Sequence, residues 1–513
     1  MVVGSPAMKI KYSYLEYLLI FFGFVLNKCF GNKYNVLFVV IDDLRPLADQ
    51  NVHLPNIYKL ARKGLNFKSV FAQQSLCAPS RNSMLTGRRP DSLQLYDFYS
   101  YWRDTVGNYT TIPQFFKEKG YDTYSVGKIF HPGKSSNYTD DYPFSWSTRP
   151  YHPPTEMFKD DAVCKDRHTK KFQKNLICPV NVHQQPGNTL PDLQSLEYAI
   201  NILKRNLSES KPVFLAIGFH KPHIPLKFPK EYLAAIPLQN VTLPTVPYMP
   251  QGMPVVSWHP WTDVRDRDDI NRLNITFPFG TMPNKWSRKI KQSYIAAALY
   301  IDDLIGILMS YVDTRNTIVV LTSDHGWSLG ENGLWAKYSN FDVALRVPLV
   351  INAPGIEPKE ITVPVELIDI FPTLVDIAFG DENIPKCRDS EDKNELCFEG
   401  KSLLPLIDDD QSPGDYVAIS QYPRPSVYPE KNSDKPRLKD IKIMGYSIRT
   451  TTLRYTEWIS FNSTCFHKNW KNNYGIELYN HTTDPTESKN LYLDPYYLDT
   501  RKELSALLRT KVG

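Results

Sequence analysis

The chain has 513 residues, which is long enough for one large domain with a smaller one or for about three domains of ordinary size. Hydrophobic residues make up 42% of it and charged residues 22%, a composition that excludes a disordered chain and a protein with many membrane spans. The net charge of +5 is small for this length, and basic residues cluster only in short pairs such as Arg88-Arg89. We therefore expect no nucleic-acid partner.

The N-terminus has the pattern of a targeting segment. Two lysines precede an apolar run over residues 18–26, which is typical of a secretory signal peptide and too short for a comfortable transmembrane helix. We predict a signal peptide over residues 1–31, with an interfacial anchor as the alternative and with Met1 or Met8 as the start. No later stretch of 18 apolar residues occurs, so we expect no membrane span in the mature protein.

Glycosylation sequons and cysteines agree with passage through the secretory pathway. Seven Asn-X-Ser/Thr sequons occur, at Asn108, Asn137, Asn206, Asn240, Asn274, Asn462 and Asn480. Two cysteine pairs are close enough in sequence to close local loops in an oxidising compartment, namely Cys164 with Cys178 and Cys387 with Cys397. Cys29 falls in the predicted signal peptide. Cys77 and Cys465 remain, either as a third pair or as free thiols.

Three short apolar runs rich in Val and Ile, over residues 36–41, 213–217 and 317–321, each lead into polar or ionisable residues. Such runs are typical of strands buried on both faces. Between them, apolar residues at helical spacing predict helices around residues 193–203 and 290–308. The alternation predicts an α/β fold with a mostly parallel sheet. Residues beyond the carboxyl ends of its strands then meet at one edge.

The composition changes over residues 421–436, where four prolines and several charges predict a linker or exposed loop. Residues 441–449 and 454–459 then alternate like strands of a small antiparallel sheet, and a terminal helix follows. We therefore predict a large domain over residues 32–420, this linker, and a C-terminal subdomain over residues 437–513.

The most informative string runs from Ser75 to Gly87, SLCAPSRNSMLTG. Because proline suits the first helical turn, Pro79 places Cys77 at a helix N-terminus, where backbone amides and the helix dipole favour an anion. Arg81, four residues on, can add a bidentate grip. These residues alone indicate a reactive thiol in an anion site or a buried cysteine.

The Cys-X-Pro-Ser-Arg string and the following Leu-Thr-Gly resemble one signature of the type I sulfatases, and residues 120–131 (GYDTYSVGKIFH) resemble a second. The resemblance extends over about residues 34–495. It implies the alkaline-phosphatase-like α/β sandwich, with a large mixed sheet, flanking helices and a smaller C-terminal α+β subdomain. It also implies a sulfate-ester hydrolase in which Cys77 is oxidised to Cα-formylglycine by the formylglycine-generating enzyme.

Further strings resemble the branch of the family that removes the 2-O-sulfate of non-reducing-end L-iduronate from heparan sulfate and dermatan sulfate; they lie at residues 88–98, 218–225, 323–343, 420–426, 432–436 and 438–450. This branch implies a sulfated glycosaminoglycan substrate and lysosomal delivery, with secretion as the alternative. Three other functions stay open: another glycan or hexuronate sulfatase, a phosphoesterase of the same fold, and an inactive secreted glycan-binding protein.

The resemblance also implies a site. One Ca²⁺ would be bound by Asp42, Asp43, residue 77, Asp324 and His325. Carboxylates are hard ligands suited to Ca²⁺, whereas a histidine is unusual, so His325 could instead orient the nucleophile. The implied catalytic set is Cys77, Arg81, Lys128, His131, His223 and Lys337.

In the implied mechanism, the hydrate of residue 77 supplies the nucleophile, and the cations hold the sulfate and offset charge in the transition state. His223, with Lys337, protonates the leaving oxygen, and His131 takes a proton as sulfate is eliminated. His220 is kept only as a neighbour. Candidate sugar contacts, with core packing as the alternative, are Trp327, Trp335, Tyr338, Trp102 and Tyr96.

Overall fold

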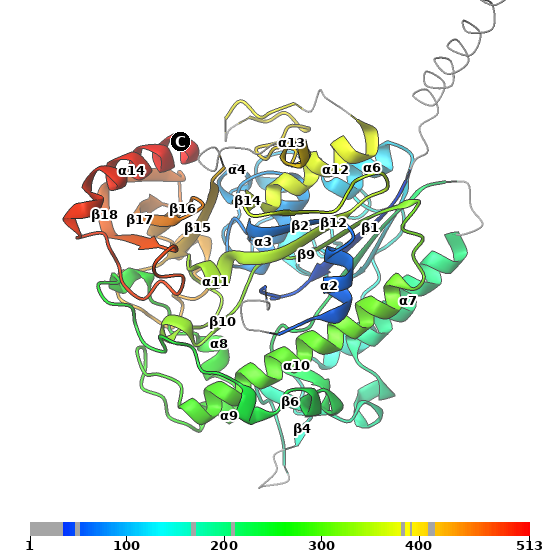
Figure 1. The fold of residues 1–513 in the computed structure, drawn as a ribbon, viewed down its shortest axis with the longest axis horizontal. Coiled ribbons are helices and arrows are strands. Elements are labelled where there is room, and N and C mark those ends of the chain that lie inside the picture. The colour runs from blue at the N-terminus through cyan, green and yellow to red at the C-terminus, as the bar shows by residue number, and fades with distance from the viewer. Residues whose placement is uncertain are drawn as a thin grey trace, which may run out of the picture.

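The computed structural model describes residues 34–46, 52–165, 171–206, 211–380, 385–389, 392–408 and 416–513. The predicted signal peptide and Cys29 lie outside this part of the chain. A large central sheet carries helices on both faces, and a smaller sheet made from C-terminal segments lies beside it (Figure 1).

The large sheet has eight strands, in the order β13 (Lys359–Ile361), β2 (Leu65–Phe71), β12 (Arg346–Asn352), β9 (Thr317–Ser323), β1 (Asn35–Ile41), β7 (Val213–Phe219) and β3 (Asp122–Gly127), with β14 (Val365–Glu366) also paired to β2. The three predicted strands are β1, β7 and β9. They are direct neighbours, since β1 pairs in parallel with both of the others. Only β12 is antiparallel to its neighbours, which confirms a mixed, mostly parallel sheet.

Helices cover both faces of this sheet (Figure 1). One core contains α2 (Pro55–Ala61), α7 (Pro191–Asn206) and α10 (Asn284–Met309), and the other contains α3 (Cys77–Thr86), α6 (Ile112–Glu118) and α12 (Ile370–Phe379). Successive strand residues point to opposite faces, so Leu37 and Val39 enter the first core, whereas Phe38 and Val40 enter the second. The predicted helices at residues 193–203 and 290–308 are therefore confirmed as α7 and α10.

Within the described residues, α10 is the one helix long and apolar enough to cross a membrane. In its most apolar window, 67% of the helix is buried inside the protein. Burial against the sheet gives a core helix the same apolar composition that a membrane would require.

The remaining elements are short. The helices are α4 (Pro90–Leu93), α5 (Trp102–Thr105), α8 (Thr262–Arg265), α9 (Asp268–Asn271), α11 (Asp342–Leu345) and α13 (Pro405–Asp408). The strands are β4 (Cys164–Lys165), β5 (Phe172–Gln173), β6 (Ile177–Val180), β8 (Leu226–Pro229), β10 (Ser328–Leu329) and β11 (Trp335–Ala336). Both predicted disulfides are present, Cys164–Cys178 and Cys387–Cys397. Cys77 is a buried free thiol and Cys465 an exposed one, so the alternative pair between them does not form.

The small sheet is antiparallel, in the order β15 (Ala418–Arg424), β16 (Ile443–Arg449), β17 (Leu453–Asn462) and β18 (His467–Asn480), and α14 (Leu498–Val512) packs on it. The predicted linker needs correction, because β15 takes its first residues. Pro423 is compatible with this strand because β15 is at the edge of its sheet, where a missing amide donor is tolerated. The domain boundaries at residues 420 and 437 stay predictions.

A buried ion pair joins the two sheets. Arg89 donates both terminal nitrogens to the carboxylate of Glu366, at 2.7 Å each, and the amide of Ile419 in β15 donates to the same carboxylate at 2.8 Å. Asp369 lies beside Glu366 and accepts the amide of Glu366 at 2.8 Å. Burial, together with the charge of Glu366, raises the pKa of Asp369 to about 7. The junction therefore holds a proton that an unfolded chain releases.

This pKa gives a stability test. Between the ordinary value of 3.8 and about 7, folded Asp369 is protonated and the unfolded residue is not, so the stabilisation it contributes falls as pH rises. In Asp369→Asn this dependence is lost. We expect the melting temperature of the wild type minus that of the variant to be roughly 2–5 °C greater at pH 5 than at pH 7.5.

Both proteins carry the same buried histidines, so the pH dependence that these histidines give to the melting temperature cancels in the difference. The matched control is Asp313→Asn, because Asp313 is partly exposed and its pKa lies below the ordinary value. A pH-independent difference for Asp369→Asn would contradict a raised pKa at this position.

Candidate active site

Two adjacent aspartates begin the site at the carboxyl end of β1. Consecutive strand residues point to opposite faces, but Asp43 has φ +65°, a left-handed conformation that turns the chain directly after the strand. The hydroxyl of Tyr294 on α10 donates to the backbone oxygen of Asp43 at 2.6 Å and accepts the amide of Arg45 at 3.1 Å. This turn lets both Asp42 and Asp43 face the same site.

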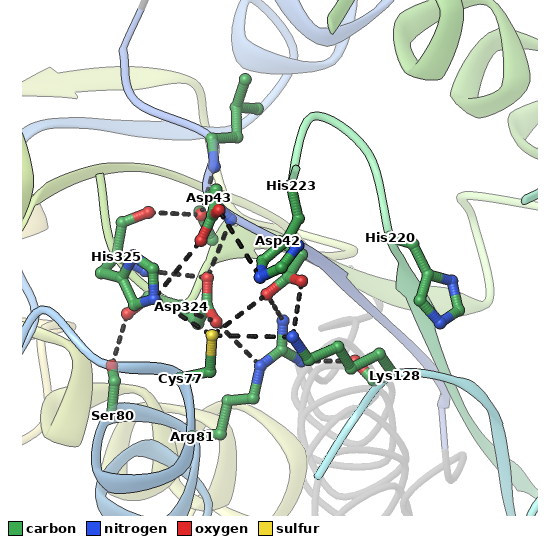
Figure 2. Close-up of polar contacts among 12 residues, drawn as sticks. Asp42, Asp43, Cys77, Ser80, Arg81, Lys128, His220, His223, Asp324 and His325 are labelled. Carbon is green, nitrogen blue, oxygen red and sulfur yellow. Dashed lines mark hydrogen bonds and ion pairs between the residues drawn. The ribbon is translucent and has the colours of Figure 1, made fainter. Parts of the chain in front are cut away.

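Cys77 is the first residue of α3, as its string predicts, and its sulfur is central among the charged groups (Figure 2). Its Sγ lies 3.0 Å from Nζ of Lys337, 3.5 Å from Nε2 of His325 and 3.6 Å from Nζ of Lys128. The residue is only 2% exposed. The predicted placement of this thiol at a helix N-terminus is therefore confirmed.

Arg81 ties two carboxylates together one turn into α3. Its Nη2 donates to Asp42 at 2.8 Å and its Nε to Asp324 at 2.9 Å, while Nη1 donates to the backbone oxygens of Lys128 and Ile129. The guanidinium is fully buried. Four of its five N–H donors are thus engaged by protein groups, which favours a positioning role, and its contact with sulfate stays a prediction.

Two lysines approach the sulfur from different elements. Nζ of Lys128, after β3, lies 2.6 Å from Asp42, and Nζ of Lys337, after β11, lies 2.7 Å from Asp43. The backbone of Lys128 passes so close to Gly218 that a Cβ there would meet it at 1.9 Å. Glycine at position 218 is therefore required for Lys128 to reach the site.

The cationic groups around Asp42 determine its charge. Burial favours its neutral form, but Lys128, His223 and Arg81 together hold the pKa of Asp42 well below its ordinary value. For Asp43 the balance is reversed, because burial raises its pKa to about 7 despite Lys337.

His325 and His223 each present one ring nitrogen. Nδ1 of His325 lies 3.0 Å from the oxygen of Gly326, and Nδ1 of His223 lies 2.6 Å from that of Ile224. A carbonyl only accepts, so both Nδ1 atoms are donors and each Nε2 faces the site. Nε2 of His325 is 3.5 Å from both Asp43 and Asp324, and Nε2 of His223 is 3.9 Å from Asp43.

His131 and His220 take different positions. The ring of His131 packs on Phe98 at 4.5 Å and lines the same cavity as Cys77, and burial and then Lys128 hold its pKa well below the ordinary value. His220 points away from the cluster (Figure 2) and pairs with Asp192 at 3.3 Å. The structure therefore separates His220 from the predicted catalytic residues, in agreement with its prediction as a neighbour of the site only.

A cavity of about 410 Å³ leads to the sulfur. Catalytic candidates that line it are Cys77, Lys128, His131, His223 and Lys337. No sequence motif indicated most of the other polar and aromatic residues of its wall, which are Tyr99, Lys134, Tyr138, Lys159, Asp263 and Lys435. They come from loops, whose sequences show no periodicity that indicates a common cavity.

Of the five predicted aromatic sugar contacts, only Tyr338 lines the cavity. Trp102 stacks with Phe130 in the core of the large domain, and Tyr96 packs on Phe461 in the core of the small sheet. These two assignments are corrected to core packing.

The other two aromatic candidates, Trp327 and Trp335, are almost fully buried and also lie outside the cavity wall. The ring of Trp327 lies below Nζ of Lys337, at 5.8 Å. It therefore supports a catalytic candidate without reaching the cavity.

The arrangement can be compared with known proteins. A family model described as sulfatase matches residues 34–380. The chain belongs to the sulfatase family. It is 48% identical over 503 residues to iduronate 2-sulfatase from Homo sapiens, an alignment that covers 90% of this chain and 91% of that protein. It is 28% identical to a sulfatase from Formosa agariphila, over 76% of each chain. The predicted class, a sulfuric ester hydrolase, is confirmed.

Solved structures share the fold of this sulfatase. One, in complex with its substrate D-glucosamine-2-N,6-O-disulfate, has a TM-score of 0.63 at 20% identity and covers 93% of this chain and 97% of that one. A phosphonate monoester hydrolase from Silicibacter pomeroyi has a TM-score of 0.66 at 20% identity, covering 93% and 95%. At this identity the likeness shows the fold alone, and it confirms the predicted alkaline-phosphatase-like architecture.

Sulfatases generally use formylglycine and a divalent metal ion, and this site offers donors for such an ion. Ligand atoms of Asp43, Cys77, Asp324 and His325 all lie within 4.8 Å of one another. In addition, Oδ2 of Asp43 is buried and has no hydrogen-bond partner. A buried carboxylate oxygen left without a donor is costly, and a cation would satisfy it. The residues therefore fit a metal ion.

A metal ion that binds the folded state must stabilise it. We expect millimolar Ca²⁺ to raise the melting temperature of chelator-treated protein by roughly 2–6 °C. Asp43→Asn should remove most of this shift, because it takes away the unpartnered oxygen's charge. The control Glu360→Gln changes an exposed carboxylate on β13 and should keep the shift. An equal shift in Asp43→Asn would place the binding site elsewhere.

Proposed function

We propose that this protein removes the 2-O-sulfate of non-reducing-end L-iduronate in heparan sulfate and dermatan sulfate. The observation that carries the proposal is the position of Cys77, whose sulfur lies among two lysines and three carboxylates at the base of a cavity. The identity of 48% to human iduronate 2-sulfatase favours this substrate over those of other sulfatases. The intact cysteine string favours sulfate over phosphate esters and over an inactive binding protein.

We propose Ca²⁺ as the metal and Cα-formylglycine as the form of residue 77. The carboxylates of Asp42, Asp43 and Asp324 are hard oxygen donors that suit Ca²⁺, whereas the sulfur of Cys77 is a soft donor that does not. Conversion by the formylglycine-generating enzyme replaces that sulfur with oxygen. Together the two groups supply positive charge for the sulfate and a hydroxyl nucleophile.

Two lysines bind the sulfate in this mechanism. The ammonium groups of Lys128 and Lys337 lie within 3.6 Å of the sulfur of residue 77, so a sulfate placed there meets both. Positive charge held in advance stabilises the charge that develops on sulfate oxygens in the transition state. Arg81 acts through the carboxylates that it fixes.

Two histidines transfer protons and a third orients residue 77. Nε2 of His223 faces the cavity and, when protonated, donates to the leaving sugar oxygen. The low pKa of His131 keeps it neutral, so it can accept the proton whose loss releases sulfate. Nε2 of His325 points at residue 77 and orients its reacting group.

The surroundings of the cavity also fit a sulfated sugar acid. Lys134, Lys159 and Lys435 line its wall, so the mouth attracts a polyanion. Lys435 is paired with Asp263 at 2.6 Å, and Tyr338 donates to the same carboxylate. This network is a candidate for recognising the sugar's own polar groups.

The sequons support entry into the secretory pathway, and we propose delivery to the lysosome, with secretion as the alternative. Among the described sequon asparagines, the exposed ones are Asn108, Asn137, Asn240, Asn274 and Asn462. Asn480 is half-buried and its side-chain amide donates to the hydroxyl of Tyr497 at 3.0 Å. A glycan on Asn480 would break this contact, so we propose the exposed sites as the glycosylated ones.

The proposed reaction is tested with three substrates. We expect turnover of a disaccharide with a 2-sulfated iduronate at its non-reducing end, and at least ~100-fold lower kcat/KM for a 6-sulfated glucosamine or a phosphate monoester. In Cys77→Ser, kcat/KM for the 2-sulfated disaccharide should fall at least ~10³-fold, because the single hydroxyl of serine cannot form the aldehyde hydrate. Mass spectrometry of the peptide around residue 77 reports conversion in the wild type. Preference for either comparison substrate would overturn the assignment.

The histidines predict an acidic optimum. Burial and then the charge of Lys159 hold the pKa of His223 well below 6.5, so kcat/KM should fall as pH rises through that low value. His131 must be unprotonated and its pKa is low too, which gives a bell-shaped profile with its maximum on the acid side of the ordinary histidine value of about 6.5. Lys159→Ala removes one positive charge and should move the alkaline limb to higher pH. Lys211→Ala, at an exposed lysine, should leave it in place. A flat profile would contradict these roles.

A further inference from the structure

Two tyrosines and a lysine at the mouth of the active-site cavity take no part in the catalytic steps described above. Tyr99, Tyr138 and Lys134 line the same cavity as Cys77, yet the tyrosines are 48% and 78% exposed whereas Cys77 is buried. Large aromatic surfaces in contact with water gain free energy when a ligand covers them. These side chains therefore offer a contact surface outside the reacting centre.

Tyr99 is held in place before any ligand arrives. Oδ1 of Asp97 accepts its amide at 2.8 Å, and Oδ2 of Asp97 accepts the amide of Leu438 at 2.7 Å. The guanidinium of Arg437 lies 4.9 Å from the ring centre of Tyr99. Because the ring is already ordered, binding to it loses little conformational entropy.

Tyr138 projects from a turn of unusual backbone conformation. It follows the short helix η2 (Lys134–Ser136), and both Asn137 and Tyr138 have left-handed φ values, +56° and +58°. Such values are unfavourable for a residue as bulky as tyrosine and persist only where surrounding contacts hold them. The amide of Tyr138 donates to the oxygen of Gly133 at 2.8 Å, which closes this turn. The turn keeps Tyr138 at the mouth of the cavity.

We propose that Tyr99, Tyr138 and Lys134 bind the second sugar of the substrate, a hexosamine that carries its own sulfate. The inference rests on the proposed function, in which the sulfated iduronate occupies the base of the cavity. The sugar linked to its C1 then lies toward the mouth. Tyrosine rings cover the apolar C–H face of a pyranose, and the exposed ammonium of Lys134 pairs with its sulfate.

This assignment makes the three residues determinants of specificity. They lie outside the cluster around residue 77, so their contacts are the same in the bound substrate and in the transition state. Contacts of this kind lower KM and leave kcat unchanged. A substrate that lacks the second sugar should gain nothing from them.

The test compares three 2-sulfated iduronides. The first is linked to 6-sulfated glucosamine, the second to unsulfated glucosamine, and the third is a methyl glycoside. In the double variant Tyr99→Ala with Tyr138→Ala, we expect kcat/KM for the second substrate relative to the third to fall about tenfold, through KM. In Lys134→Gln, kcat/KM for the first substrate relative to the second should fall about threefold. Replacing Tyr138 leaves the sequon of Asn137 intact.

Matched controls use Tyr58→Ala and Lys68→Gln, at exposed residues of α2 and β2 outside the cavity wall, and both ratios should stay at their wild-type values. Unchanged ratios in the cavity variants, or an equal loss on all three substrates, would overturn the proposed sugar site. A wild type that hydrolyses none of the three would instead overturn the proposed function. Wild-type activity on all three with unaltered ratios in the variants would overturn the sugar site alone.

Discussion

Three aspartates share one buried site, and this concentration of negative charge governs the rest of the structure. Buried like charges repel strongly and are stable only when cations offset them. Arg81 joins Asp42 to Asp324, while Lys128 and Lys337 each pair with one aspartate from the cavity side. The cations that make the carboxylates tolerable are therefore also those that a sulfate would meet. Stability of the folded protein and affinity for an anion depend on the same few contacts.

The small sheet takes part in this arrangement. Ala336 and Tyr338, on either side of Lys337, both have left-handed φ values, which is costly for residues with a Cβ. Nη2 of Arg424 in β15 donates to the backbone oxygen of Tyr338 at 2.8 Å and helps to hold this loop. A strand of the second sheet thus supports a lysine at the base of the first sheet's cavity. The two sheets form a single functional unit.

Most of the fold followed from the sequence because its signals are local, whereas the residues of the charged centre were implied by the resemblance to the sulfatases. The strands at 36–41 and 317–321 are continuous apolar runs, and the helix start at Cys77 is marked by Pro79. Residues adjacent to such motifs were harder to place: Trp102 lies next to loop residues of the site but packs into the core. The prolines near β15 suggested a linker because proline usually interrupts a strand. An edge strand tolerates proline, and the sequence does not show that β15 lies at an edge. The tyrosines of the cavity mouth lie on loops, where the direction of a side chain depends on tertiary contacts.

The burial of Cys77 has a consequence for the order of events during synthesis. Its sulfur is enclosed by His325 and Lys337, which the ribosome adds about 250 residues later, and His325 follows β9, the strand that pairs with β1. Because Cys77 is only 2% exposed in the folded protein, the proposed modifying enzyme needs this segment before it is buried. That requirement is met while the chain is still emerging and is no longer met after β9 has joined the sheet. The proposed oxidation of this residue and formation of the central sheet therefore compete in time.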